Sequence, residues 1–168
     1  MIDLKEIKNK ITIKKNLYFF IIIFSIFFLD RYSKSVILDD FSDSVLYLND
    51  FLNFDLVWNT GIGFGLFSTD STLFYNLITL LFGLVVLILS FIGLQMEKGE
   101  KIVFSLIIGG ALGNFYDRLF FKAVPDFIDI HYGNVHWFTF NVADICITFG
   151  IILYLIFDMF KLKNVDNE

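Results

Sequence analysis

The sequence predicts an all-α membrane protein with four transmembrane helices and a small extracytoplasmic β element. Hydrophobic residues make up 57% of its 168 residues, whereas a soluble domain of this size typically has about 45–50%. The excess lies in long apolar runs of the length that a helix needs to cross a bilayer. One stretch between the first two runs alternates between apolar and polar residues, which is typical of a half-buried strand. By length, residues 1–168 form a single membrane-embedded domain.

Four segments are long and apolar enough to be predicted as membrane spans. The expected helices cover residues 16–38, 73–96, 102–121 and 138–157, with outer loops over residues 39–72 and 122–137. The first apolar run is followed by Asp30, Arg31 and Lys34 rather than by the small residues of a cleavage site. We therefore expect it to be a retained helix and not a signal peptide.

The positions of the basic residues predict the topology. Lysines cluster before the first helix, between the second and third helices, and after the fourth, whereas residues 39–72 contain no Lys or Arg. Basic flanks stay in the cytoplasm, so both termini are expected there and both long loops outside. Three helices then carry charged side chains at one depth near the outer face, where such charges usually mark function. These side chains are Asp30, Lys34, Asp117, Arg118 and Asp144.

The alternating stretch runs from Leu52 to Trp58 in the first outer loop. Leu52, Phe54, Leu56 and Trp58 fall on one face of the predicted strand. We expect a small sheet on the outer membrane surface, with this apolar face toward lipid or substrate.

Asp30 and Lys34 are four residues apart, so on a helix they share a face and can form an ion pair. The plainer interpretation is a buried pair that orients the first helix, because pairing lowers the cost of burying charge. A catalytic lysine is the alternative. Ser33 is a poor partner for it, because adjacent residues on a helix point about 100° apart.

Small residues from Gly109 to Gly113, including Gly110, allow a second helix to approach closely. Asn114, Asp117 and Arg118 follow on one face of the same helix. Asp117 and Arg118 are either part of a site or interfacial residues whose charged ends reach the membrane surface.

Two further aspartates are candidates for chemistry. Asp126 lies in the second outer loop, and Asp144 opens the fourth helix one turn after Asn141. Each alone is usually a solvated residue or a charge favoured by the helix dipole. Two carboxylates in one site cannot both ionise easily. One can then act as general base for water while the other, protonated, polarises a carbonyl group.

Other chemistries are weakly supported. His131 and His136 lie in a loop without cysteine, and no His-Glu-x-x-His motif occurs, so the sequence predicts no metal site. The single cysteine, Cys146, excludes an internal disulfide. No dinucleotide fingerprint or Gly-x-Ser-x-Gly elbow is present. We expect no cofactor, no nucleic-acid partner and a monomeric protein.

Five motifs in order resemble those of the lipoprotein signal peptidase (signal peptidase II) family, from about Asp30 to Gly150. In the first helix Asp30 and Lys34 match, with Arg31 in place of the family's Gln. Residues 59–65 resemble the family's Asn-x-Gly-Ala-Ala-Phe-Gly, with Ile62 and Gly63 in place of the alanines. The remaining matches are Gly109, Gly110, Gly113, Asn114, Asp117 and Arg118; Val124, Asp126 and Phe127; and Phe140, Asn141, Ala143 and Asp144.

The resemblance implies an aspartic endopeptidase of the bacterial inner membrane. It implies that Asp126 and Asp144 are the catalytic pair. It implies that a substrate site is lined by Asn59, Asn114, Arg118 and Asn141. The expected partners are membrane lipid and a prolipoprotein whose cysteine already carries diacylglycerol and which is cut on the amino side of that cysteine. Asp30, Lys34, Gly110 and Asp117 are expected to support the site.

The alternative from a different class is a small transporter or channel subunit with a charge cluster in the outer leaflet. Such a protein needs a polar path through the full membrane. The second helix has no charged residue, and the inner halves offer little beyond Thr79 and Ser105. A purely structural membrane subunit is a third possibility, and loss of function on mutation of the two aspartates would discriminate against it.

Overall fold

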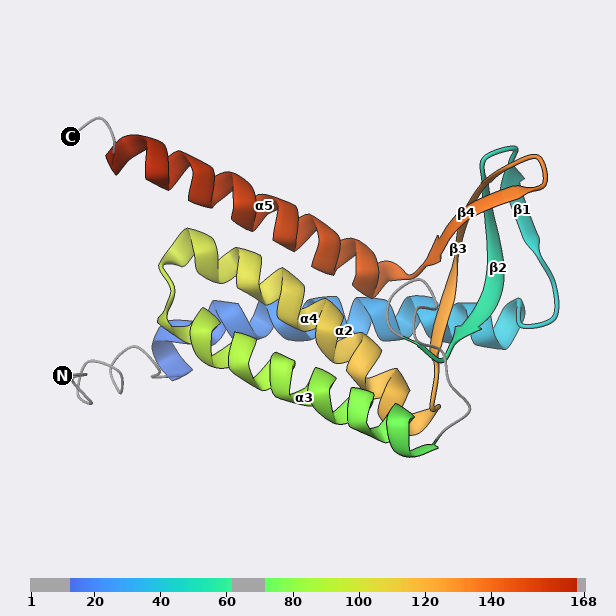
Figure 1. Cartoon of the computed structure of the whole chain (residues 1–168), viewed down its shortest axis with the longest axis horizontal. Helices are drawn as coiled ribbons and strands as arrows, with labels where there is room; N and C mark the ends of the chain where they lie inside the picture. The colour runs from blue at the N-terminus through green and yellow to red at the C-terminus, as the bar shows by residue number, and fades with distance from the viewer. Residues whose placement is uncertain (1–12, 62–71, 166–168) are drawn as a thin grey trace.

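The computed structural model describes residues 13–61 and 72–165. In this part of the chain four helices lie side by side, and an antiparallel sheet adjoins one end of them (Figure 1). The helices are α2 (Ile13–Asp40), α3 (Thr72–Gln95), α4 (Lys98–Phe120) and α5 (Val142–Val165). The strands are β1 (Leu46–Asn49), β2 (Leu52–Asn59), β3 (Val124–Tyr132) and β4 (Val135–Phe140).

Three of these helices are long and apolar enough to cross a membrane. They are α3, α4 and the Val142–Lys161 part of α5. The 28-residue α2 is not among them, so the expected count of four spans is not confirmed. Its apolar run ends at Leu29, and Asp30, Arg31 and Lys34 follow within the helix.

Helix α4 is the centre of the bundle and contacts each of the other three helices. Its Ile108 is buried in a cluster with Phe19 and Ile23 of α2 and Val86 of α3. The packing is close where α4 is rich in glycine. A Cβ atom on Gly110 would lie 2.5 Å from the carbonyl oxygen of Ala143 at the start of α5. Glycine therefore sets the approach of α4 to α5 at the level of the candidate site.

Figure 1 shows which helix ends lie at each end of the bundle. The start of α2, the α3–α4 junction and the end of α5 lie together, far from the sheet. The sheet lies at the opposite end, where α4 leads into β3 and β4 leads into α5. The polar residues of the candidate site lie at this second end.

The sheet is larger than the sequence predicts. Its order is β1-β2-β3-β4, so β2 from the first expected loop pairs with β3 from the second. Residues 122–137 are therefore mostly a β-hairpin rather than a loop. Helix α5 begins at Val142 and not at residue 138, because Phe138 and Phe140 pair with Ile130 and Ile128 of β3. Hydropathy alone cannot separate Phe138 and Phe140 from the apolar helix that follows.

A β-bulge in β2 changes which face its last residues occupy. Phe54 lies opposite Ile128, whereas Val57 lies opposite Asp126, so β2 contains one extra residue. Asn59 is therefore paired with Val124 and shares a face with Asp126, two residues further along β3. In an unbulged strand Asn59 would point to the other face. The expected alternation from Leu52 to Trp58 is broken at this point.

Candidate active site

Polar side chains from five elements meet between the bundle and the sheet. They come from α2, β2, α4, β3 and α5, and all but the partly buried Asp144 are buried. The set contains Asp30, Lys34, Asn59, Asn114, Asp117, Arg118, Asp126, Asn141 and Asp144. Most of these residues are joined through side-chain hydrogen bonds into one network.

Asp126 is held by two amide side chains. Asn59 Nδ2 donates to its Oδ2 at 2.9 Å, and Asn141 Nδ2 donates to its Oδ1 at 2.6 Å. Asp126 lies on β3 and is only 4% exposed. Both carboxylate oxygens therefore have a fixed orientation relative to β2 and to the start of α5.

Asp144 is held by Asn114 and by the start of its own helix. Asn114 Nδ2 donates to Asp144 Oδ1 at 2.8 Å. The Asp144 N–H donates to Asn141 Oδ1 at 3.0 Å, and the Asn141 N–H donates to Asp144 Oδ2 at 3.2 Å. This reciprocal pair is a capping box, which satisfies free N–H groups at the start of a helix. Asn141 thus binds both Asp126 and Asp144.

The surroundings of Asp126 favour its protonated form. Burial, together with the nearby charge of Asp144, raises the pKa of Asp126 from 3.8 to about 6. The amides of Asn59 and Asn141 oppose this shift because they favour the ionised form. Near neutral pH Asp126 can therefore hold a proton or release it.

Lys34 supports the site from the first helix. Its Nζ donates to Asp30 Oδ2 at 2.8 Å, to Asn114 Oδ1 at 2.9 Å and to Asp117 Oδ2 at 2.7 Å. Because Lys34 occupies the oxygen of the Asn114 amide, the NH₂ group of that amide faces Asp144. Lys34 is 0% exposed and has no contact with either candidate catalytic aspartate among the hydrogen bonds of the described residues.

Asp117 binds the cations of α2 rather than Arg118. It forms ion pairs with Lys34 and with Arg31, the residue that replaces the Gln of the family pattern. The opposite charges lie on adjacent helices, so Asp117 joins α4 to α2 at this depth.

Asp30 joins α2 to α5. Its Oδ1 accepts a hydrogen bond of 3.0 Å from the N–H of Ala143, and its other oxygen pairs with Lys34. Gly113 of α4 leaves room for this carboxylate, because a Cβ atom there would overlap the Asp30 side chain. The Asp30–Lys34 pair therefore does more than orient one helix.

Arg118 lies beside the site but donates to backbone. Its Nη2 donates to the carbonyl oxygen of Gly61 at 2.9 Å, and its Nη1 donates to that of Asn114 at 3.2 Å. The guanidinium carbon lies 4.3 Å from the ring centre of Phe82. Arg118 thus fixes the chain just after Asn59. Residues 62–65 of the expected motif lie outside the described residues.

An apolar groove leads along α5 to Asp144. It has a volume of about 390 Å³. Its lining consists of Phe138, Phe140, Asp144, Ile145, Thr148, Phe149 and Ile152. Asp144 is the one ionisable residue in this lining, so an apolar chain lying in the groove would pass beside a carboxylate.

Two polar residues were missed by the sequence analysis. Arg31 was noted only as a departure from the family pattern, yet it pairs with Asp117. Asp129 was not singled out, although it lies beside His131 and His136 on the sheet. These three residues are the group among the described residues that could hold a metal ion. The signal for Asp129 was the Asp-x-His spacing, which places both side chains on one face only if the segment is a strand.

The fold and the site together define a helical membrane protein with two carboxyl groups bridged by an asparagine at one end of its bundle. The family described as signal peptidase (SPase) II matches residues 22–161. The chain belongs to this family and is an integral membrane peptidase.

Relatives and solved structures agree with this assignment. The chain is 45% identical to the lipoprotein signal peptidase of Pelagibacter ubique over 95% of this chain and 98% of the relative. It is 37% identical to that of Francisella tularensis subsp. novicida over 90% of this chain and 97% of the relative. A bacterial membrane enzyme solved by the in meso method has a TM-score of 0.69 and 28% identity, covering 90% of this chain and 91% of that one.

Proposed function

We propose that this protein is an aspartic endopeptidase that removes signal peptides from diacylglyceryl-modified bacterial prolipoproteins. The cut falls on the amino side of the lipidated cysteine. The observation that carries the proposal is the pair of Asp126 and Asp144, which Asn141 joins by hydrogen bonds to both. Its family and its named relatives support prolipoprotein as the substrate.

The reaction needs one protonated and one ionised carboxyl group. Asp126, with a pKa near 6, supplies the proton that polarises the scissile carbonyl. Asp144, partly exposed beside the groove, accepts a proton from a water molecule as that water adds to the carbonyl carbon. The proton that Asp144 took from water then passes to the cysteine nitrogen as the C–N bond breaks, and Asp126 recovers its proton from the former carbonyl oxygen. The products are a signal peptide with a free carboxylate and a lipidated protein with a new amino terminus.

The groove beside α5 supports an apolar substrate. Phe138 and Phe140 lie on one side of Asp144, and Ile145, Phe149 and Ile152 continue along α5. A signal-peptide segment or an acyl chain has the apolar surface that such a lining favours. Asn59 and Asn114 then orient the carboxylates, and Arg118 shapes the β2 end of the site.

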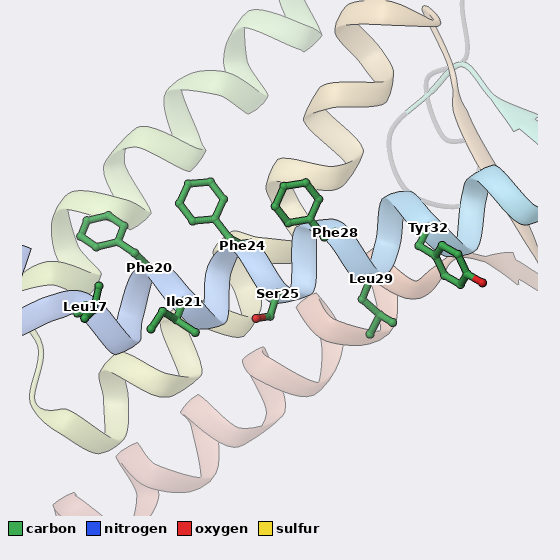
Figure 2. Close-up of a pocket in the computed structure, with 8 residues that line it drawn as sticks. All are labelled: Leu17, Phe20, Ile21, Phe24, Ser25, Phe28, Leu29 and Tyr32. Atoms are coloured by element: carbon green, nitrogen blue, oxygen red, sulfur yellow. The ribbon is translucent and has the colours of Figure 1, made fainter.

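We also propose that α2 is the fourth membrane span. Leu17, Ile21, Phe24 and Phe28 are each more than half exposed. Figure 2 shows Phe20, Phe24 and Phe28 projecting one turn apart from one side of α2. A continuous apolar face of this kind is stable against lipid but not against water. With the helix ends sorted as in Figure 1, both termini face the cytoplasm and the site faces outward across the inner membrane.

The direct test uses the purified protein in detergent with a synthetic prolipoprotein peptide. The peptide is prepared with and without diacylglycerol on its cysteine, and the products are identified by mass. We expect cleavage of the lipidated peptide alone, at the bond before cysteine. Equal cleavage of both peptides would contradict the lipid requirement. Cleavage of neither by a folded protein would contradict the proposed activity.

A further inference from the structure

Asp129, His131 and His136 form a second polar cluster, separate from the two candidate catalytic aspartates. Asp129 Oδ2 lies 2.8 Å from His136 Nδ1 and 3.2 Å from His131 Nδ1. The imidazole rings are stacked, with centres 5.3 Å apart. One potential ligand atom from each residue lies within 4.8 Å of the other two.

The sheet register places this cluster on one face. Asp129 and His131 are two residues apart on β3, and His131 is paired with His136 of β4. A register shift between Ile130 and His131 produces this pairing, because regular pairing would put Trp137 opposite His131. Asp126 is three residues before Asp129 on a strand without an extra residue, so its side chain points to the opposite face. The two clusters are therefore on different sides of β3.

Buried polar atoms in this cluster lack partners. Asp129 is 2% exposed and His131 is 5% exposed. Within the described residues, Asp129 Oδ1 and His131 Nδ1 have no hydrogen-bond partner. Leaving such atoms buried and unsatisfied costs free energy. His136 Nδ1 is hydrogen-bonded to Asp129 Oδ2 at 2.8 Å. A cation between the carboxylate and the two rings would replace this bond and give His131 Nδ1 a partner.

Asn53 of β2 can fix the ring tautomer that His131 needs as a metal ligand. His131 Nε2 lies 3.3 Å from the Asn53 amide, whose Oδ1 has no partner among the described residues. Turning this amide by 180° places its oxygen against Nε2, which then donates its N–H. The lone pair of His131 is left on Nδ1, facing Asp129. A hydrogen bond from the far ring nitrogen is the usual support of a histidine that binds a metal.

We propose that Asp129, His131 and His136 bind a zinc ion. Two imidazole nitrogens and a carboxylate oxygen suit zinc, whereas Ca²⁺ and Mg²⁺ prefer oxygen ligands throughout. At zinc–ligand distances of about 2.0–2.2 Å, tetrahedral ligands lie roughly 3.3 Å from one another. The two separations from Asp129 Oδ2, 2.8 Å and 3.2 Å, are close to this value. The ligand atoms of the two histidines lie within 4.8 Å of each other and would move together on binding zinc. The His136 side chain is 55% exposed, which leaves an entry path from solvent.

The zinc ion would join β3 to β4 and, through Asn53, to β2. It thereby stabilises the strand that carries Asp126, without contacting the carboxylates of the candidate active site. Binding to the folded protein alone raises thermal stability by an amount that grows with the logarithm of the ratio of zinc concentration to Kd. The site is therefore structural rather than catalytic, and binding is the property to measure.

The test uses the full-length protein in detergent, without a histidine tag and stripped with a chelator. His131 and His136 are the chain's only histidines, so imidazole coordination of any added metal reports on this cluster. After zinc is added back and the excess is removed, we expect about one zinc per chain and a higher Tm than that of the stripped protein. Cobalt substitution is expected to give the visible absorption of a tetrahedral site with nitrogen ligands.

Two variants decide the ligand set. His136→Ala changes an exposed side chain and leaves folding intact, and Asp129→Asn keeps the size of the carboxylate. Each is expected to weaken zinc binding by more than about tenfold and to abolish the rise in Tm. The control, Asp55→Asn, changes a β2 carboxylate outside the cluster and keeps wild-type binding. The proposal is overturned if the wild type binds zinc no more tightly than His136→Ala, or if Asp129→Asn binds zinc as tightly as the wild type.

Discussion

Asn141 is the residue on which the geometry of the candidate site depends most. Its side-chain oxygen caps α5, its side-chain NH₂ binds Asp126, and its backbone N–H binds Asp144. A single side chain thus couples the start of a membrane helix to a strand of the sheet. Because an amide carries no charge, it can do this without neutralising either carboxylate.

Replacing either aspartate of the pair by asparagine is expected to abolish cleavage. An amide matches the carboxylate in size but cannot exchange a proton with water or substrate. General acid–base catalysis contributes about 10²–10⁴-fold, so each of Asp126→Asn and Asp144→Asn should lose at least that much rate. The measurement is initial rate per folded molecule, with Asp55→Asn as the control. An active Asp126→Asn beside an inactive Asp117→Asn would move the acid pair to Asp117 and Asp144.

The raised pKa of Asp126 predicts a pH limit on activity. The group is protonated below about pH 6 and ionised above it, so a reaction that needs the proton slows as pH rises through that value. The amide of Asn59 favours the ionised form, and its removal in Asn59→Ala should raise the pKa further. The alkaline limb of kcat/KM should therefore move to higher pH in Asn59→Ala. If the alkaline limb stays at the same pH or moves to lower pH in Asn59→Ala, a group other than Asp126 titrates there.

Helices α2 and α4 are joined by ion pairs at the level of the site. Asp117 of α4 pairs with Lys34 and Arg31 of α2. Asp117→Asn would leave the buried Lys34 with Asp30 as its one remaining carboxylate partner. Breaking a buried pair in this way costs about 3–5 kcal/mol.

Asp117→Asn and Asp30→Asn are therefore expected to lower the amount and the Tm of the protein, with reduced but measurable cleavage. Tm and rate per folded molecule are measured together on each variant. A fully stable Asp117→Asn with no activity would instead place Asp117 in the chemistry.

The exposed side chain of Trp58 near the end of β2 predicts that the sheet takes part in substrate binding. Trp58 is 45% exposed and its ring lies 6.1 Å from that of Phe121 at the end of α4. Tryptophan favours the membrane interface, where one edge of the ring is wet and the body is apolar. Trp58→Asp should raise KM for the lipidated peptide several-fold more than it lowers kcat. If this variant has wild-type kinetics, this part of β2 does not contribute to substrate binding.

At the scale of the whole molecule, charge and hydropathy predict the orientation in the membrane. The α3–α4 junction carries Lys98, whereas Asp43 lies between α2 and the sheet, at the other end of the bundle. Topology reporters fused at these two positions should report opposite sides of the membrane, with Lys98 cytoplasmic. If both reporters lie on the same side, α2 is not a span and the orientation is wrong.

The sequence by itself determined the class of protein and the helix ends at which its polar residues gather. Apolar length, lysine position and helical spacing act locally, so they place Asp30, Lys34, Asn114 and Asp117 on the correct elements and faces. The motif resemblance pointed to the family to which the chain belongs. Which charges pair could not be predicted between helices, and the Arg31–Asp117 contact is an example.

The tertiary structure alone decided how the sheet is built and which polar residues share a face. Strand pairing between residues 46–59 and 124–140 is non-local, and no periodicity in either segment predicts a bulge. One bulge turns Asn59 toward Asp126, and a second aligns His136 with His131. Because side chains alternate along a strand, a single extra residue reverses every later position. Hydropathy and motif spacing carry no information on that reversal, which is set by pairing across the sheet.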